Sequence, residues 1–324
     1  MGLPAAMATQ IGRGPTAVPV VEAGGRWLER MAAAGDGMAG VSAAIMRVPR
    51  AGAGHLLPRG RRSLPDVDVT TPSPARMYDY YLGGKDNFTA DREAAEKALS
   101  VIPEGRAVAR ANRRFMVRAV RYLARNGIKQ FIDLGTGIPT RPNVHEAARG
   151  ITPDAHVVYV DNDPVVTMHN RALLANNNTG VVALHGDIRY PQGIATSEPL
   201  RRVIDFSQPV AVLFVAVLHF LTNGDDPYNS VCVFRDHMPA GGYLVVSHIT
   251  SDGIDPTVIS TIRAAYSNAS APAVFRSRDE INQFFTGFRL VRPGLVEVAE
   301  WRSNNRKQEN LLALRFLGGV GRRL

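Results

Sequence analysis

The feature that most constrains the fold is an alternation of short apolar runs with helical patterns between residues 129 and 269. The apolar runs are rich in β-branched residues and have few polar positions, so each predicts a strand buried on both faces. The predicted strands are residues 129–135, 155–163, 180–187, 209–220 and 241–248, and the predicted helices are residues 143–150, 164–177, 225–238 and 255–269. This alternation predicts an α/β fold, with a parallel sheet covered by helices on both faces.

Two further apolar segments, residues 288–301 and 310–320, follow without a helix between them. Strands that follow one another without a crossover helix usually pair antiparallel. We therefore expect an antiparallel hairpin at one edge of an otherwise parallel sheet.

Three segments are expected along the chain. Residues 1–65 are rich in Gly, Ala, Arg and Pro and show no sustained period, which predicts a disordered or poorly ordered extension. Helices are then expected from Ser73, which has the residue type of an N-cap, to Gly83, which has that of a helix end, and over residues 91–99 and 107–127. The predicted segments are the extension (1–65), an N-terminal helical lid (66–127) and the main domain (128–324).

Charge and composition exclude several classes of protein. The formal net charge is +9, but residues 1–65 carry +5 of it, and no stripe of basic and aromatic residues indicates nucleic-acid binding. No apolar run approaches the ~20 residues of a membrane-spanning helix, and the first residues lack the pattern of a signal peptide. The single cysteine, Cys232, excludes an intrachain disulfide and a cysteine-based zinc site, and we expect it to be a small buried residue. A cytoplasmic protein fits these features.

Residues 131–148, FIDLGTGIPTRPNVHEAA, follow the first predicted strand and have the form of a nucleotide-binding loop. Ligands of parallel α/β sheets bind at the carboxyl ends of the strands, near the point where the strand order reverses. Gly135 and Gly137 would let the backbone approach a ligand closely, because a Cβ there would collide with it. The same two glycines fit an ordinary tight turn, and this loop alone leaves both interpretations open.

Acidic residues at the next two strand ends favour the interpretation that the loop binds a ligand. Asp161 closes the second strand, where a carboxylate can accept both hydroxyls of a ribose. Asp163 has the residue type of the following helix's N-cap, which leaves Asp161 free for another role. Asp187 and Ile188, at the end of the third strand, could place an acidic acceptor and an apolar contact against an adenine ring. Three successive strand ends that carry an aspartate are more specific than any one of them.

The segments FIDLGTG, VYVDNDP, GDI, VAVLHF and GGYLVVSH together resemble a class I S-adenosylmethionine (SAM)-dependent methyltransferase. With the loop DLGTGIPTRPNVHEAA, the block SPARMYDYYLGGKDNFTADREAAEKAL narrows this to a mainly actinobacterial family of such enzymes, with largely unassigned substrates. The resemblance covers roughly residues 66–318. It implies SAM as cofactor and a Rossmann-like fold. That fold has a mostly parallel seven-stranded sheet with helices on both faces, an antiparallel C-terminal hairpin strand and an N-terminal helical lid.

The resemblance also implies which residues surround each part of SAM. The implied neighbours of the methionine part are Asp133, Gly135, Thr136 and Gly137. Those of the ribose are Asp161 and Asn162, those of the adenine are Asp187 and Ile188, and those near the sulfonium are Ala216, Val217 and His219. The class pattern has another glycine at Pro139, whereas the family carries Pro-Thr there, and Pro142 leaves open how the next helix begins.

The N-terminal helices are expected to lie over the cofactor as a lid. The implied lid contacts are Tyr78, Tyr81, Gly83 and Lys85, with Gly84, Asp86, Asn87 and Phe88 beside them. Arg76 and Lys85 could meet the carboxylate of SAM or an acidic group of the substrate. Tyr78 and Tyr81 lie three apart on one helix and could instead simply pack on the core.

Methyl transfer from a sulfonium is an in-line displacement with an activated leaving group, so proximity and alignment supply most of the catalysis. No catalytic triad is therefore expected. If a general base is used, His219 is the first candidate and His248 the second, although a structural role is open for both. The other histidines lack HxH or HExxH spacing, so no metal site is predicted. The acceptor is expected to be a small molecule that the sequence does not identify, and the oligomeric state also stays open.

Two alternative functions remain. An NAD-dependent dehydrogenase needs glycine at the first, third and sixth loop positions, and here the sixth is Thr140. A SAM-binding sensor or regulatory protein without turnover is the other alternative, because methyltransferases have no obligatory catalytic residue whose loss would show in a sequence.

Overall fold

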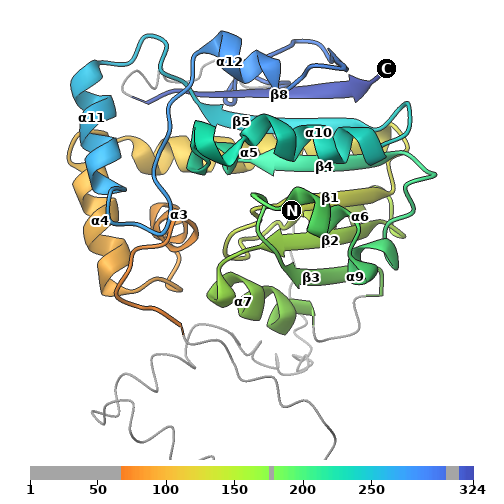
Figure 1. Cartoon of the computed structure of the whole chain (residues 1–324), viewed down its shortest axis with the longest axis horizontal. Coiled ribbons are helices and arrows are strands. Elements are labelled where there is room, and N and C mark those ends of the chain that lie inside the picture. The colour runs from red at the N-terminus through yellow and green to blue at the C-terminus, as the bar shows by residue number, and fades with distance from the viewer. Residues whose placement is uncertain (1–66, 175–178, 304–313) are drawn as a thin grey trace, which may run out of the picture. The chain divides into compact units, whose positions relative to one another are not determined.

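The computed structural model describes residues 67–174, 179–303 and 314–324, and the predicted extension over residues 1–65 lies outside them. One sheet with helices on both faces forms the body of the protein (Figure 1). The strands are β1 (Gln130–Leu134), β2 (His156–Asp161), β3 (Val181–His185), β4 (Val210–Val215), β5 (Tyr243–Ile249), β6 (Phe288–Leu290), β7 (Val296–Glu297) and β8 (Phe316–Arg323). The helices are α3 (Pro74–Leu82), α4 (Thr89–Leu99), α5 (Gly105–Arg125), α6 (Val144–Arg149), α7 (Pro164–Leu174), α8 (Pro191–Ala195), α9 (Glu198–Arg201), α10 (Pro227–His237), α11 (Pro256–Ala265) and α12 (Arg278–Gln283), with 3₁₀ turns η1 (Leu218–Phe220) and η2 (Asn223–Asp225).

The strand order is β3-β2-β1-β4-β5-β8-β6, and β7 also pairs with β8. Strands β1 to β5 pair in parallel, and β8 runs antiparallel to β5 and β6. The predicted mostly parallel sheet with antiparallel C-terminal strands is therefore confirmed. The expected count of seven strands was one short, because the two-residue strand β7 pairs with β8. The strand order reverses between β1 and β4, which is where ligands bind in sheets of this kind.

Side chains alternate between the two faces of the sheet, and both faces are covered. All five residues of β1 are buried. Phe131, Leu213 and Val245 pack in the layer that contains α5 and α6. Ile132 and Val212 pack in the opposite layer, with residues of α8, α10 and α12. Neither face of the central strands meets water, and this is why the strand segments of the sequence are almost continuously apolar.

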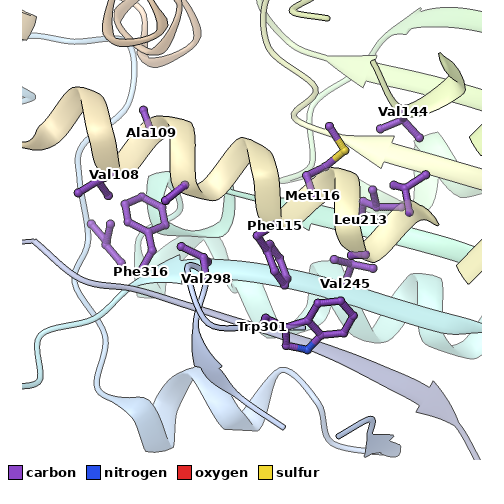
Figure 2. Close-up of a cluster of buried hydrophobic side chains, with 14 of the residues drawn as sticks. Val108, Ala109, Phe115, Met116, Val144, Leu213, Val245, Val298, Trp301 and Phe316 are labelled. Atoms are coloured by element: carbon purple, nitrogen blue, oxygen red, sulfur yellow. The ribbon is translucent and has the colours of Figure 1, made fainter. Parts of the chain in front are cut away.

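Helix α5, which was expected to belong to the lid, packs directly on the sheet. Figure 2 shows Phe115 pointing from α5 toward Trp301 and the strand of Val245. The rings of Phe115 and Trp301 meet edge to face, with their centroids 5.5 Å apart. Phe115 also reaches β8, since a Cβ at Gly318 would lie 2.9 Å from its ring. A glycine in the strand thus allows this helix to approach closely.

Two sequence expectations are corrected by the structure. Strand β4 ends at Val215 rather than at residue 220, because Ala216 adopts a positive φ of 56° and the chain turns into η1. Cys232 is half-buried on α10 rather than fully buried.

Among the helices that the structure describes, none is long and apolar enough to cross a membrane.

Candidate active site

A cavity lies at the carboxyl ends of β1 to β4, where the strand order reverses. Predicted residues from all four strand ends line it, together with Tyr78 of α3. The strand-end residues are Asp133, Gly135, Thr136, Gly137, Asp161, Asn162, Asp187, Ile188, Ala216 and Val217. The structure therefore brings together residues that lie more than 130 positions apart in the chain.

Asp161 organises the loop that follows β1. Its Oδ2 accepts a hydrogen bond from the backbone N–H of Gly137 at 2.9 Å, and its Oδ1 accepts one from the N–H of Asp163 at 2.9 Å. Gly137 has a φ of 68°, which explains the glycine, while a Cβ there would meet open space. At Gly135 a Cβ would instead lie 2.1 Å from Cγ2 of Val217. The loop after β4 thus approaches position 135 so closely that any side chain there would collide with it.

Ile138 stands just after the two glycines, and it is buried. It forms a small apolar cluster with Val165 and Val166 of α7. The buried side chain of Ile138 thus fixes the end of the loop by packing on α7. A dinucleotide-binding fingerprint would instead continue to a third glycine.

Arg113 of α5 holds the next part of the loop. Its guanidinium donates to the carbonyl oxygens of Thr140 and Pro142, the latter at 3.0 Å. Helix α6 begins just beyond, where the side chain of Glu146 accepts from the backbone N–H of Asn143 at 2.7 Å. This capping contact places the helix start after Pro142, which the sequence had left open.

The two buried carboxyl groups at the strand ends titrate near neutral pH. Burial raises the pKa of Asp133 to about 6 and that of Asp161 to about 7. For Asp133 the hydroxyl of Thr136, which donates to Oδ2 at 2.9 Å, opposes that rise. Asp187 differs, because hydrogen bonds from Arg189 outweigh its partial burial and hold its pKa below the ordinary value. Perturbed carboxyl groups of this kind often mark a functional site.

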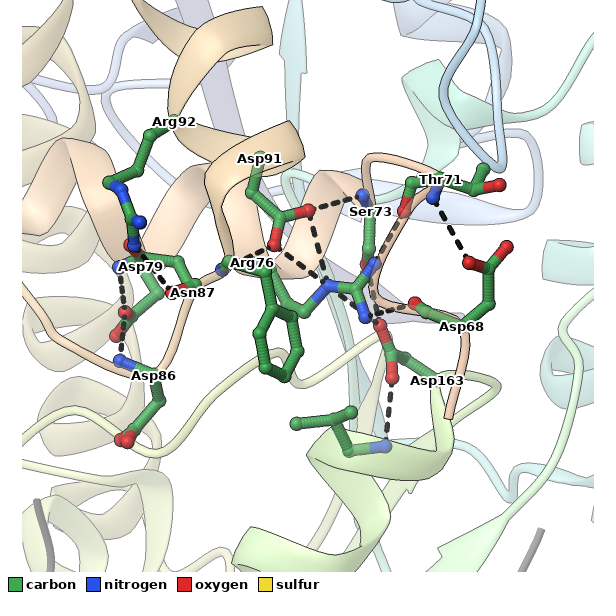
Figure 3. A network of polar contacts seen from close by, with 12 residues as sticks. Asp68, Thr71, Ser73, Arg76, Asp79, Asp86, Asn87, Asp91, Arg92 and Asp163 are labelled. Carbon is green, nitrogen blue, oxygen red and sulfur yellow. Dashed lines mark hydrogen bonds and ion pairs between the residues drawn. The ribbon is translucent and has the colours of Figure 1, made fainter. Parts of the chain in front are cut away.

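Helix α3 is tied to the strand ends by the polar network in Figure 3. The hydroxyl of Ser73 donates to Oδ2 of Asp163 at 2.6 Å. The guanidinium of Arg76 lies between two acids, with Nε 3.1 Å from Oδ2 of Asp91 and 4.0 Å from Oδ2 of Asp163. Arg76 is buried in this network and does not line the cavity, so the structure does not bring it to the expected carboxylate of SAM.

Three of the implied lid contacts also lie away from the cavity wall. Tyr81 is buried, with its hydroxyl 3.3 Å from that of Tyr266. Gly83 ends α3 with a φ of 83°, and Lys85 is exposed. Tyr78 is thus the implied lid contact that reaches the cavity wall.

The hydroxyl of Tyr78 has two partners in α5. It donates to the carbonyl of Ala109 at 3.0 Å and accepts from Nδ2 of Asn112 at 2.9 Å. Burial raises the pKa of Tyr78, so the hydroxyl keeps its proton at neutral pH. Tyr78 is therefore a fixed, uncharged part of the cavity wall.

Neither candidate base lines this cavity. Burial lowers the pKa of His219 well below its usual value and that of His248 to about 3, so both rings are neutral. His248 is fully occupied, with Nδ1 2.6 Å from the carbonyl of Ile249 and Nε2 2.9 Å from the guanidinium of Arg276. His219 lines a neighbouring cavity instead.

Several residues of the wall were not expected from the sequence. Arg189 follows Asp187 by two positions, which is a signal that could have been used, whereas Arg113 is one of many arginines in its helix. The further lining residues that the sequence did not suggest include Asn112, Met116, Phe220, Leu221, Asp225, Ser270, Ala271 and Pro272. Among the residues that the structure describes, no group of three or more His, Cys, Asp or Glu side chains is placed to hold a metal ion.

Comparison with known proteins identifies the family. The model of a family described as S-adenosyl methyltransferase matches residues 61–324. The chain belongs to this family. It is thus a SAM-dependent methyltransferase, with SAM as cofactor, rather than an NAD-dependent dehydrogenase. No protein of curated function matches the chain.

Two crystal structures similar to this methyltransferase come from actinobacteria. One, from Thermobifida fusca, is described as a candidate methyltransferase. It is 39% identical, with a TM-score of 0.74, over 79% of this chain and 96% of that one. The other, a DUF574 family protein from Streptomyces avermitilis, is 35% identical, with a TM-score of 0.76, over 80% of this chain and 100% of that one.

Proposed function

We propose that the methyltransferase binds SAM in the cavity at the carboxyl ends of β1 to β4 and transfers its methyl group to a small molecule. The observation that carries this proposal is the placement of Asp133, Asp161 and Asp187, from three successive strand ends, around one cavity. SAM carries a cationic sulfonium and a cationic ammonium, and an acidic cavity attracts both. The fold then acts by holding the donor and the acceptor in line.

The parts of SAM are assigned to the lining residues as follows. Asp161 accepts the ribose hydroxyls, because two of the roughly four lone pairs of its ionised form remain after its two backbone hydrogen bonds. Asp187 and Ile188 flank the adenine. Asp133 and the loop of residues 135–137 face the methionine part.

Arg113 replaces Arg76 and Lys85 as the proposed partner of the SAM carboxylate. It lines the cavity, and its charge partly opposes the rise that burial causes in the pKa of the neighbouring Asp133. It also holds the loop through two carbonyl groups, so its position is fixed before the cofactor arrives.

We further propose that the lid consists of α3 and α4, without α5. We also propose that the enzyme works in the reducing cytoplasm, where its single half-buried cysteine stays free.

Calorimetric titration with SAM and with NAD tests the proposed site. SAM is expected to bind and NAD is not. Asp161→Ala should weaken SAM binding by roughly 1–3 kcal/mol, because partners that Asp161 satisfies are left unpaired. Asp205→Ala is the matched control, since Asp205 is exposed and lies at the opposite end of β1, where its carbonyl accepts from Gln130. Unchanged affinity in Asp161→Ala, or NAD binding without SAM binding, would overturn the proposal.

A further inference from the structure

A second cavity lies directly beside the first. Tyr78 and Phe220 line both cavities, so the two share a wall. Residues of α3, α4, α5, α11, β5 and β8 complete the enclosure, among them Tyr81, Ala98, Val108, Ile262 and Phe316. The second cavity thus lies where the proposed lid meets α5, α11 and the strands β5 and β8.

The walls of the second cavity are mostly apolar and carry no charged side chain among the residues that the structure describes. Its polar groups are the hydroxyls of three tyrosines and the ring of His219. Burial raises the pKa of Tyr78 and Tyr81, and that of Tyr266 to about 12, so these hydroxyls stay protonated. A charged molecule would lose its hydration here without gaining an ionic partner, which excludes it energetically.

His219 supplies a buried imidazole to this wall. The residue is 4% exposed, and its Nδ1 has no hydrogen-bond partner within the described part of the chain. The ring is fixed by aromatic neighbours, with centroids 4.4 Å from Phe220 and 5.5 Å from Phe316. Leaving such a buried atom unpaired is unfavourable, because its hydrogen bonds to water are lost on folding and are not replaced. The neighbouring His248 pairs both of its nitrogens, which shows that the same region can satisfy an imidazole fully.

We propose that this second cavity binds the methyl acceptor. The acceptor is a small, uncharged molecule whose apolar end enters this cavity and carries a hydrogen-bonding group that pairs with the imidazole of His219, while its nucleophilic atom lies at the other end. The proposal rests on the proposed binding of SAM in the first cavity. His219 is then a recognition residue for the acceptor rather than a general base, because its neutral ring does not hold a proton at neutral pH.

The size of the cavity limits the acceptor further. Its volume is about 60 Å³, whereas a cavity of roughly 150 Å³ holds a whole benzene molecule. Only one end of a single ring, or a short branched chain, therefore enters the second cavity. The rest of the acceptor extends past Tyr78 and Phe220 toward the first cavity, where its reactive atom meets the methyl group.

The transfer step uses only the groups of the two substrates. A lone pair of the acceptor forms the new bond to the methyl carbon while the carbon–sulfur bond breaks and its electron pair stays on sulfur. The products are the methylated acceptor and S-adenosylhomocysteine. The proton of the acceptor leaves to water.

The test uses the full chain saturated with S-adenosylhomocysteine and three probes of similar shape, followed by fluorine NMR. The probes are 4-fluorophenol, 4-fluorotoluene and 4-fluorobenzoate. We expect 4-fluorophenol to bind, 4-fluorotoluene to bind about three- to tenfold more weakly for lack of one hydrogen bond, and the benzoate not to bind. Failure of 4-fluorophenol to bind, or equal or tighter binding of the benzoate, would overturn the proposal.

Two pairs of variants locate the bound probe. Ala98→Leu adds bulk to the cavity wall and should weaken 4-fluorophenol at least about tenfold by steric exclusion, while Ala94→Leu, one turn earlier on α4 and outside both cavities, should not. His219→Leu should bring 4-fluorophenol down to the affinity of 4-fluorotoluene, and His219→Asn, which keeps a polar side chain at this position, should restore part of the preference. Equal effects of the Ala98 and Ala94 variants, or a preference that survives in His219→Leu, would refute the assignment.

The affinity for S-adenosylhomocysteine separates this proposal from the one on which it rests. It should be unchanged in all four variants, because none of the substituted residues lines the first cavity. If the wild-type protein binds neither SAM nor S-adenosylhomocysteine, the proposed SAM site fails. If it binds them and ignores 4-fluorophenol, the acceptor site alone fails.

Discussion

The hydroxyl of Ser73 donates to Asp163 at 2.6 Å, and this contact joins the residue before α3 to the N-cap of α7. The side chain of Ser73 does not cap its own helix. Its backbone N–H donates to Oδ1 of Asp91 at 2.8 Å, so both polar groups of this residue fix the start of α3. Helix α3, which belongs to the proposed lid, is thereby held against the loop that follows Asp161.

Ser73→Ala removes this contact. A hydrogen bond to a carboxylate contributes about 1.5–3 kcal/mol, so we expect a loss of that order in the free energy of unfolding, measured with urea, and weaker SAM binding in calorimetry. Ser267→Ala is the matched control, because the hydroxyl of Ser267 is exposed and bonds only to the carbonyl of Ala264 in its own turn. If both variants lose equally little stability, the link does not hold the lid.

The raised pKa values of Asp133 and Asp161 predict that stability depends on pH. Both groups bind a proton more tightly in the folded protein than in the unfolded chain, so the free energy of unfolding of the free enzyme should fall as pH rises from about 4 to about 7. Urea unfolding across this range measures the trend. A rise in stability over the same range in the wild type, or the same fall in Asp133→Asn and Asp161→Asn, would show that other groups dominate.

Binding of SAM should release protons for the same reason. The cationic cofactor favours the ionised form of both carboxyl groups, so its affinity should rise between about pH 6 and pH 8, as Asp161 loses its proton. Calorimetry at about pH 6.5 in two buffers with different ionisation enthalpies gives the number of protons released. The value should be positive in the wild type and smaller in Asp161→Asn, and a value of zero in the wild type would contradict the assignment.

Arg276 is buried and holds the loop that carries His219 and Phe220. Its guanidinium donates to the carbonyls of Leu218 at 3.1 Å and Leu221 at 2.9 Å. Arg276→Met should lower the free energy of unfolding by at least about 2 kcal/mol, because it removes several charge-assisted hydrogen bonds from the interior.

The control for Arg276 is Arg202→Met. Arg202 forms an exposed ion pair with Glu198 one helical turn away, and such pairs contribute roughly 0–1 kcal/mol. Urea unfolding of both variants gives the comparison. Similar losses in the two would mean that the buried guanidinium does not organise its loop.

The close packing around Gly318 predicts that any side chain at this position destabilises the folded protein. Gly318→Ala would place a Cβ 2.9 Å from the ring of Phe115 and the same distance from Val298, so we expect a loss of about 1–3 kcal/mol in the free energy of unfolding. Gly193→Ala is the control, since a Cβ there meets nothing and alanine favours the helix α8. In thermal unfolding, the Tm should fall in Gly318→Ala and rise in Gly193→Ala.

The strand ends of this enzyme were predictable because the carboxyl ends of parallel strands meet at one edge of a sheet. Asp133, Asp161 and Asp187 each follow a local apolar run, and their meeting depends only on the sheet being parallel. The end of β4 was not predictable in this way. The run from Val215 to Phe220 is apolar because its side chains pack into the core layers on both faces of the sheet, and the turn at Ala216 leaves no mark in its hydropathy.

Apart from Tyr78, the helical side of the cavity could not be derived from the sequence. Arg113 lies among several arginines in α5, and which of them faces the cavity depends on how the helix is rotated against the sheet. The same is true of Arg76, whose partner Asp91 lies in another helix. Contacts between elements that are far apart in sequence decide these roles, and a periodic pattern does not carry that information.

Strand β8 lies between β5 and β6, although it comes later in the chain than either of them. Helix α5, which carries Arg113 and Asn112, rests on β8 through Phe115 and Gly318. During synthesis, therefore, β5 and β6 emerge from the ribosome before β8 can be inserted between them and support this wall of the cavity. Until then α5 lacks this contact, and the cavity at the strand ends has no finished wall on that side.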